Sequence, residues 1–188
     1  MPAIASSAIF LLAWMSAMTV AADELHVLLD FDTAAEAELF SPIDDAVMGG
    51  VSSSRLVVEE PGIAVFSGNV SLENNGGFAS VRSLPRDWGT AAAREFVLRV
   101  RGDGKRYRFN VRTPDGPSAF RYEAPIETTA GAWAEVTIPI ERLEAKAFGR
   151  RVPLVGAPDP ARIRSLGFMI SDRQAGPFRL EIDWIAWR

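Results

Sequence analysis

Apolar and polar residues alternate along much of this chain, which is the pattern of β-strands that bury one face. The alternation is clearest over residues 94–101 and 106–112. Between these segments, Gly102-Asp103-Gly104-Lys105 has the Asp-Gly centre that is typical of tight hairpin turns. We therefore predict a β-hairpin with all its apolar pairs on one face. The predicted pairs are Val100 with Tyr107, Leu98 with Phe109 and Phe96 with Val111.

The other face of this predicted hairpin is strongly basic. Its four arginines face one another, and like charges directly across a ladder repel. We expect the last strand to compensate, because Glu181 and Asp183 would point outward from it. Alternatively, the arginines present guanidinium forks to an anion or an acidic partner. The facing pairs are Arg101 with Arg106 and Arg99 with Arg108, and the inward residues of the last strand are predicted to be Phe178, Leu180, Ile182 and Trp184.

Turn residues recur at close intervals along the chain and helical periodicity is scarce, so the pattern predicts an all-β, single-domain sandwich. A length of 188 residues with 48% hydrophobic residues suits one core, and no internal repeat or linker divides the chain. Further strands are predicted at residues 27–31, 55–59, 63–72, 78–83, 118–123, 134–140 and 163–171, with short helical turns at 34–39 and 140–143. A long loop is predicted over residues 147–160.

The N-terminal region has the pattern of a secretory leader. Residues 8–20 carry no charge, and Val20-Ala21-Ala22 offers small residues for cleavage before Asp23. This predicts a signal peptide over residues 1–22, a mature domain over 23–188, and a periplasmic or secreted protein without a stable membrane span. The alternatives are an uncleaved anchor, or translation from Met15 or Met18, which would leave a cytoplasmic protein.

The amino-acid composition argues against several kinds of binding and catalytic site. The net charge of −4 provides no general attraction to nucleic acid, and the absence of cysteine excludes disulfides and thiolate chemistry. His26 is the single histidine, which argues against a serine–histidine–aspartate triad and against histidine zinc sites. We expect no enzymatic activity, cofactor or metal. If the chain were a glycoside hydrolase, its paired carboxylates would come from Asp44, Asp45, Glu73 and Asp172. If it held a structural calcium ion, the ligands would come from Asp30, Asp32 and Asp183.

Three glycine-rich clusters stand out, at residues 44–52, 73–82 and 167–178. The first two contain double glycines, which favour sharply shaped turns. Acidic residues beside them can accept hydrogen bonds from the turn amides, so capped turns between strands are one interpretation. A binding site made from the three clusters is the other.

In order and spacing, these clusters resemble the complex I intermediate-associated protein 30 family over about residues 31–187. The resemblance implies a galactose-binding-like, jelly-roll-type β-sandwich related in shape to carbohydrate-binding modules. Mitochondrial members of the family assist assembly of respiratory complex I. The matching segments are residues 45–52, 65–68, 76–82, 101–105 with Tyr107, Trp133, and 167–170.

For function, the resemblance implies a non-catalytic protein-binding or assembly factor, with respiratory complex I subunits or intermediates as partners. We expect Met48 to supply an adaptable apolar contact and Asp45 and Arg82 to supply polar ones. The candidate binding residues are Asp45, Met48, Gly49, Gly50, Ser52, Asn75, Gly76, Gly77, Phe78, Arg82, Asp172 and Gln174.

The alternative function is an exported carbohydrate-binding module that binds a glycan. Trp88 and Trp133 would then stack on sugar rings, while Asn74, Asn75 and Gln174 would bind hydroxyl groups. The exposure of the tryptophans separates the two hypotheses, because sugar platforms must be open to solvent on one face.

Overall fold

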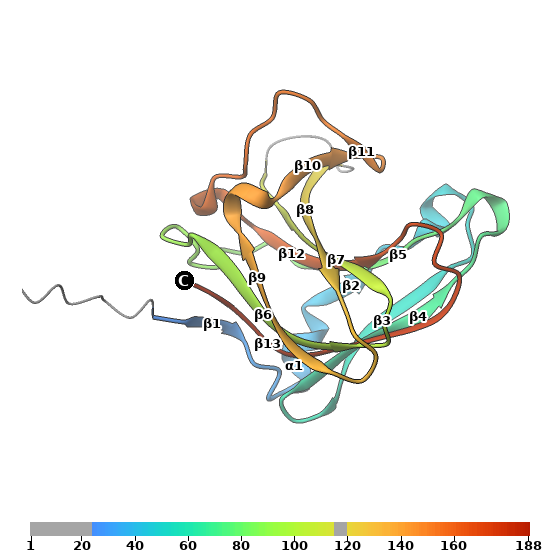
Figure 1. Cartoon of the computed structure of the whole chain (residues 1–188), viewed down its shortest axis with the longest axis horizontal. Coiled ribbons are helices and arrows are strands. Elements are labelled where there is room, and N and C mark those ends of the chain that lie inside the picture. Colours follow the sequence, from blue (N-terminus) through green and yellow to red (C-terminus); the bar gives the residue numbers. More distant parts are fainter. Residues whose placement is uncertain (1–23, 115–119) are drawn as a thin grey trace, which may run out of the picture.

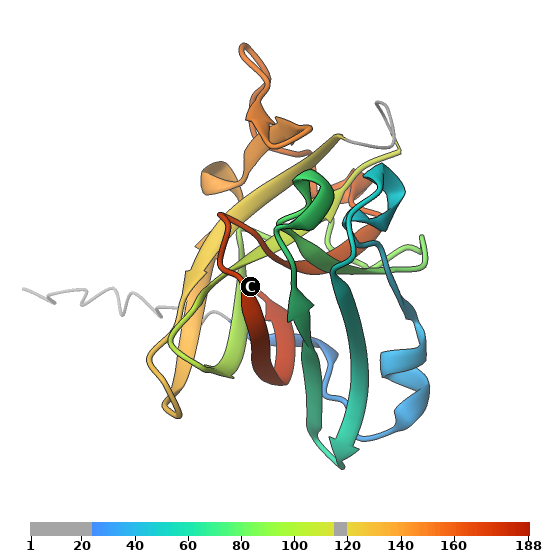
Figure 2. The ribbon, with the colours of Figure 1, turned by 90° about the vertical axis from the view of Figure 1, so that its right-hand side faces the viewer.

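The computed structural model describes residues 24–114 and 120–188, which form two antiparallel sheets packed face to face (Figure 1). Figure 2 shows the two layers from the side. The six-stranded sheet has the order β3-β4-β13-β6-β9, with β1 paired to β13, and the seven-stranded sheet has the order β11-β10-β8-β7-β12-β5-β2. The predicted all-β sandwich is confirmed. The predicted leader, residues 1–22, lies outside the described residues, so export stays a prediction.

Most predicted strands form, with shifted ends. The strand β8 begins at Phe120 and continues to Glu127, past its predicted end, and the predicted 147–160 loop contains the short strand β11. The strands of the six-stranded sheet are β1 (His26–Leu29), β3 (Ser53–Glu60), β4 (Ile63–Val70), β6 (Glu95–Gly102), β9 (Trp133–Pro139) and β13 (Gly176–Trp187). Those of the seven-stranded sheet are β2 (Phe40–Pro42), β5 (Ala79–Ser83), β7 (Arg106–Arg112), β8 (Phe120–Glu127), β10 (Glu144–Ala147), β11 (Arg150–Arg151) and β12 (Ser165–Ile170).

The helical segments are short and connect strands. Both predicted turns are confirmed, as α1 (Ala34–Glu38) and the 3-10 turn η3 (Ile140–Arg142). The Glu36 carboxylate accepts a hydrogen bond from the Thr33 N–H (3.3 Å) and so closes the first turn of α1. Three further 3-10 turns are η1 (Asp45–Met48), η2 (Glu73–Asn75) and η4 (Pro160–Arg162).

The predicted hairpin between β6 and β7 is wrong, because the two strands belong to different sheets. The strand β6 pairs with β9 and β13, whereas β7 pairs with β8 and β12. The rings of Phe96 and Phe109 meet across the core with centroids 5.1 Å apart. Alternation shows only which side chains face the core, and strands facing each other across a core show the same alternation as paired neighbours.

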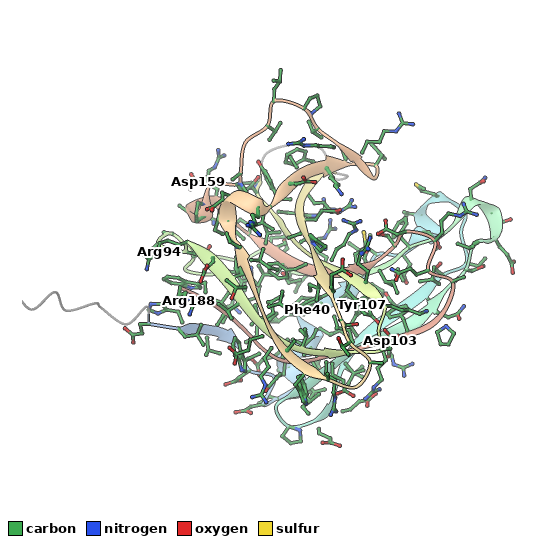
Figure 3. All side chains as sticks on the ribbon, in the orientation of Figure 1. Phe40, Arg94, Asp103, Tyr107, Asp159 and Arg188 are labelled. Carbon is green, nitrogen blue, oxygen red and sulfur yellow. The ribbon has the colours of Figure 1, made fainter. Side chains whose placement is uncertain are left out.

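Tertiary contacts hold the segment between β6 and β7 in its crossing path from sheet to sheet. The Asp103 carboxylate accepts hydrogen bonds from the Tyr107 hydroxyl (2.9 Å) and the Arg179 N–H (3.0 Å). Figure 3 shows Asp103 and Tyr107 side by side at this crossing. Because Arg179 lies on β13, the turn is anchored to a strand distant in sequence.

The predicted facing of four arginines fails for the same reason, since two lie on each sheet. On the six-stranded sheet, Arg99 pairs with Asp183 (3.2 Å) and Arg101 pairs with Glu181. The prediction that the last strand compensates these two charges is therefore confirmed. On the other sheet, Arg106 pairs with Glu127 (2.8 Å), and the remaining arginine, Arg108, belongs to the site described below.

The last strand contains an irregularity that changes which residues face inward. Phe178, Leu180 and Ile182 are buried as predicted. The register of β13 against β6 shifts between Ile182 and Trp184, so Ile185 is fully buried and Trp184 is only partly buried. The predicted inward position of Trp184 is wrong, because one extra residue at a bulge moves the following side chains to the other face.

A buried carboxylate, Asp45, joins the two sheets at one end of the sandwich. Its oxygens accept hydrogen bonds from the backbone N–H (2.9 Å) and hydroxyl (2.6 Å) of Ser52, just before β3. They also accept from the N–H groups of Gly77 (2.7 Å) and Phe78 (3.3 Å), just before β5. Since β3 and β5 belong to different sheets, one side chain ties both layers together.

The preceding residue, Asp44, makes a parallel connection. Its carboxylate accepts from the N–H (2.9 Å) and hydroxyl (2.6 Å) of Ser54 in β3 and from the N–H of Ser80 (2.9 Å) in β5. We call Asp44 and Asp45 the aspartate clamp. Two consecutive carboxylates therefore hold the ends of both sheets at a fixed separation.

The double glycines of the first two clusters fit around the Asp45 carboxylate. A Cβ atom at Gly50 would lie 2.3 Å from Asp45 Oδ1, and one at Gly76 would lie 2.6 Å from Asp45 Oδ2. Gly49 ends η1 with a φ of 90°, a left-handed conformation that favours glycine. The glycines of the two clusters thus leave room for the buried Asp45 carboxylate, and backbone N–H groups of both clusters donate hydrogen bonds to it.

We predict that Asp45→Asn destabilises the protein by about 2 kcal/mol or more, since hydrogen bonds to a charged group contribute about 1.5–3 kcal/mol each. The new amide NH₂ would face an N–H donor where an acceptor is required. Urea denaturation at neutral pH measures the change. The matched control is Asp32→Asn, at an exposed position, and equal stability of the two variants would contradict the structural role of Asp45.

The same carboxylate predicts an acid-dependent loss of stability. Burial opposes ionisation, but the hydrogen bonds from Ser52, Gly77 and Phe78 outweigh it and hold the pKa of Asp45 below its ordinary value of 3.8. A lowered folded-state pKa stabilises the fold above pH 3.8, and this contribution is lost as the pH falls below that value. The stability difference between the wild type and Asp45→Asn should therefore shrink below pH 3.8; a constant difference would show that the charge is unimportant.

Candidate functional site

A cleft of about 640 Å³ crosses the outer face of the seven-stranded sheet. We call it the outer-face cleft. It is lined by residues from all three glycine-rich clusters, which answers whether these distant segments meet. Its floor comes from five adjacent strands, β10, β8, β7, β12 and β5, whose order can be followed in Figure 1. The floor side chains are Lys146, Arg121, Glu123, Arg108, Arg112, Met169, Ser80 and Arg82.

Exposed apolar side chains form two rims of this cleft. On one side, η1 presents Val47 and Met48, whose residues are 73% and 62% exposed. On the other side, Phe148 follows β10 and is 79% exposed. Apolar groups left this open beside a polar floor are typical of surfaces that bind a partner.

A buried carboxylate organises the basic floor. Glu123 is 3% exposed and accepts hydrogen bonds from Arg108 (2.9 Å), Arg121 (2.6 Å) and Lys146 (2.9 Å). Burial favours the neutral acid, but Arg121, Lys146 and Arg108 outweigh it and lower the pKa of Glu123. One negative charge is thus shared by three positive ones, and the group as a whole remains cationic.

Two further arginines lie on either side of β12. In the sheet register Arg82 of β5 lies opposite Gly167, and Arg112 of β7 lies opposite Ser165. A Cβ atom at Gly167 would lie 2.6 Å from the Val81 carbonyl oxygen and 2.9 Å from Asn110 Oδ1. Only glycine fits here, so β12 presents no side chain directly beside Arg82.

The structure divides the predicted binding residues into two groups. Met48, Gly76, Gly77, Phe78, Arg82 and Asp172 line the cleft. The others do not line it. Asp45 and Ser52 are buried in the clamp, and Gly49 and Gly50 complete the turn around it. Asn75 is exposed on η2, and Gln174 bonds to the Arg106 backbone N–H (2.9 Å) and carbonyl (2.7 Å).

Several cleft residues escaped the sequence prediction. The alternation in β7 and β8 places Arg108, Arg112, Arg121 and Glu123 on the outward face of their strands. That signal is present in the sequence, but the predicted β6–β7 hairpin assigned Arg108 to the wrong neighbours. Phe148 carries no periodic signal, because it lies in the connection between β10 and β11.

None of the four tryptophans in the described part of the chain lines the outer-face cleft. Trp88 is buried and its Nε1–H donates to the Arg164 carbonyl (3.0 Å). Trp133 lies under the guanidinium groups of Arg99 and Arg101, 5.5 and 4.8 Å from its ring centroid, on the other sheet. The ring of Trp187 stacks on His26 with centroids 4.1 Å apart, and Trp184 lies at the β13 bulge. The outer-face cleft therefore lacks the tryptophan platform that is expected for binding a sugar ring.

Within residues 24–114 and 120–188, no group of three or more histidine, cysteine or acidic side chains is placed to hold a metal ion. The Asp44 and Asp45 carboxylates are occupied by clamp donors, and Asp172 accepts from Arg108 Nη2 (2.8 Å). None of the helices in these ranges is both long and apolar enough to cross a membrane.

A second hollow, of about 810 Å³, lies beside β8, β9 and β10. It is larger than the outer-face cleft, but no residue of the three glycine-rich clusters lines it. Its Arg106 and Glu127 side chains neutralise each other in an ion pair. The outer-face cleft is therefore the candidate site.

Solved structures share this sandwich. The family 11 carbohydrate-binding module of cellulase Lic26A-Cel5E from Clostridium thermocellum superposes with a TM-score of 0.64 and 17% identity, covering 88% of this chain and 95% of that one. The agarase AgWH50C superposes with a TM-score of 0.59 and 13% identity over 87% of this chain and 24% of its own. At such identities the likeness establishes the galactose-binding-like fold alone.

Sequence relatives are closer. A protein from Caenorhabditis elegans named "Probable complex I intermediate-associated protein 30, mitochondrial" is 31% identical over 186 residues, which cover 87% of this chain and 54% of that protein. The mouse protein of that family is 37% identical over 109 residues, covering 55% of this chain and 32% of its own length. This chain thus spans about half the length of the worm protein. The family model for complex I intermediate-associated protein 30 matches residues 29–182, and the chain therefore belongs to that family.

Proposed function

We propose that this protein is a non-catalytic assembly factor for respiratory complex I, and that it binds a protein partner in the outer-face cleft. The observation that supports this most is the meeting of the three glycine-rich clusters around one cleft. These clusters carry the resemblance to the family, and the family model spans nearly all of the described sandwich. The family relates the chain to complex I assembly, and the cleft offers a place for binding.

The chemistry of the cleft suits a protein partner. Its rims expose Val47, Met48 and Phe148, while its floor is polar. Protein interfaces combine adaptable apolar anchors, such as methionine and phenylalanine, with directional polar contacts from arginine. A glycan would instead require flat aromatic faces beside hydroxyl-binding groups, and the tryptophans of the described residues lie elsewhere.

We predict that cells lacking this protein contain less assembled complex I. Native gels of membranes, together with NADH:ubiquinone oxidoreductase activity, measure the amount. Expression of the wild type should restore both. Met48→Asp and Phe148→Asp should not, because a charge at an apolar anchor weakens binding by about 2 kcal/mol or more, which is roughly thirtyfold.

The matched control is Leu154→Asp, since Leu154 is fully exposed but does not line the cleft. It should restore complex I as well as the wild type does. Melting temperatures of all three variants exclude unfolding as the cause. Normal complex I in the deletion strain would overturn the assembly role, and full rescue by both rim variants would overturn binding in the cleft.

A further inference from the structure

The outer-face cleft concentrates positive charge on a protein that is negative overall. The chain has a net charge of −4, yet six cationic side chains line this one cleft. Glu123 neutralises part of that charge, and Asp172 at the edge pairs with Arg108 (2.8 Å). The cationic residues are Arg82, Arg108, Arg112, Arg121, Lys146 and Arg173, so with Glu123 and Asp172 the lining keeps an excess of four positive charges. Such local fields attract anionic partners.

Arg82 carries the strongest indication of a missing ligand. Its residue is half-buried, and burial lowers its pKa. Across the described ranges 24–114 and 120–188, its guanidinium group has no hydrogen bond or ion pair to another residue. Partial desolvation of a charge is costly unless a partner compensates it. An anion seated in the cleft would provide that compensation.

The neighbours of Arg82 further raise the free-energy cost of keeping its guanidinium group charged without an anionic partner. Burial, together with the positive charges of Arg82 and Arg121, lowers the pKa of Arg112 to about 10, which leaves Arg112 cationic at neutral pH. One of its Nη atoms donates to the Phe120 carbonyl (2.8 Å). Like charges gathered at close range repel one another, and an added carboxylate would offset this repulsion by attracting both guanidinium groups.

The spacing of these charges indicates the shape of the ligand. Arg82 and Arg112 stand on the two strands that flank β12, so their backbones are separated by about 10 Å across the sheet and by about 7 Å along the strands. In an extended peptide, side chains on one face recur about every 7 Å, and those between point the other way. Successive carboxylates of such a segment can reach both guanidinium groups, while its alternate residues contact the apolar rims.

We propose that the outer-face cleft binds an acidic, extended segment of a partner protein, with carboxylates facing Arg82 and Arg112 and apolar side chains against Met48 and Phe148. This inference rests on the proposed function for the partner being a protein. A single phosphate group would engage only part of the basic floor and would leave both apolar rims unused. Arginine suits carboxylates in particular because its planar fork donates two parallel hydrogen bonds.

The probe is a short fluorescein-labelled peptide that alternates glutamate with leucine, and its counterpart carries glutamine for glutamate. Fluorescence anisotropy measures binding to the full chain. We expect the glutamate peptide to bind, the glutamine peptide to bind much more weakly, and added salt to weaken the glutamate complex. Arg82→Gln should reduce affinity about tenfold or more, which corresponds to about 1.4 kcal/mol.

The matched control is Arg55→Gln, because Arg55 is exposed on β3 of the other sheet, and it should bind like the wild type. Melting temperatures confirm that both variants fold. Equal binding of the two peptides, or equal binding by Arg82→Gln and the wild type, would overturn the proposal. Binding confined to inorganic pyrophosphate, or to a β-1,3-1,4-mixed-linked tetrasaccharide used as a glycan probe, would overturn it as well.

Complementation of the deletion strain separates this inference from the proposed function. If the deletion lowers complex I but Arg82→Gln restores it fully and no peptide binds, the assembly role stands and the acidic-segment inference fails. If the deletion leaves complex I intact while the peptide binds through Arg82, the assembly role fails and the binding chemistry of the cleft stands.

Discussion

The aspartate clamp is the interaction on which the arrangement of this sandwich depends. The Asp45 carboxylate accepts hydrogen bonds from backbone N–H groups just before β3 and just before β5, and the Asp44 carboxylate accepts them from N–H groups within these strands. The two strands lie in different sheets. Hydrophobic packing holds the sheets together along their length, but it has no direction. The clamp adds direction, because charge-assisted hydrogen bonds fix where each strand starts. It also supports η1, which carries one of the two apolar rims of the cleft.

The cleft therefore combines a rigid frame with an unbalanced charge. On the rim side, the Asp45 carboxylate has donors from Ser52, Gly77 and Phe78. On the floor, Glu123 has three cationic partners, and Arg82 has no partner of its own among the described residues. The satisfied groups hold the backbone in place, whereas the excess positive charge faces the cleft. Structure and binding thus depend on different residues of neighbouring segments.

Much of the fold is predictable from the sequence, because period-two alternation reports which side of a strand is apolar. Most strands and the inward faces of β6 and β7 follow from that pattern, whereas the short strands β2, β10 and β11 were not predicted. Strand pairing does not. Phe96 and Phe109 face each other across the core rather than along one sheet, and a turn of the hairpin type can equally cross between layers. The bulge before Trp184 cannot be predicted from the local sequence either, because it depends on the register of β13 against β6.

By itself, the sequence determined the fold class, the clusters of glycine and aspartate and the family to which they belong. Only the tertiary structure decided what these clusters do. Asp45 bonds to Gly77, 32 residues away, and Arg82 shares a cleft with Arg112 and Arg121 although they lie on different strands. Local patterns reflect neighbours along one strand, whereas a site depends on which strands lie beside one another. That order is set by long-range hydrogen bonds and by packing of the whole core.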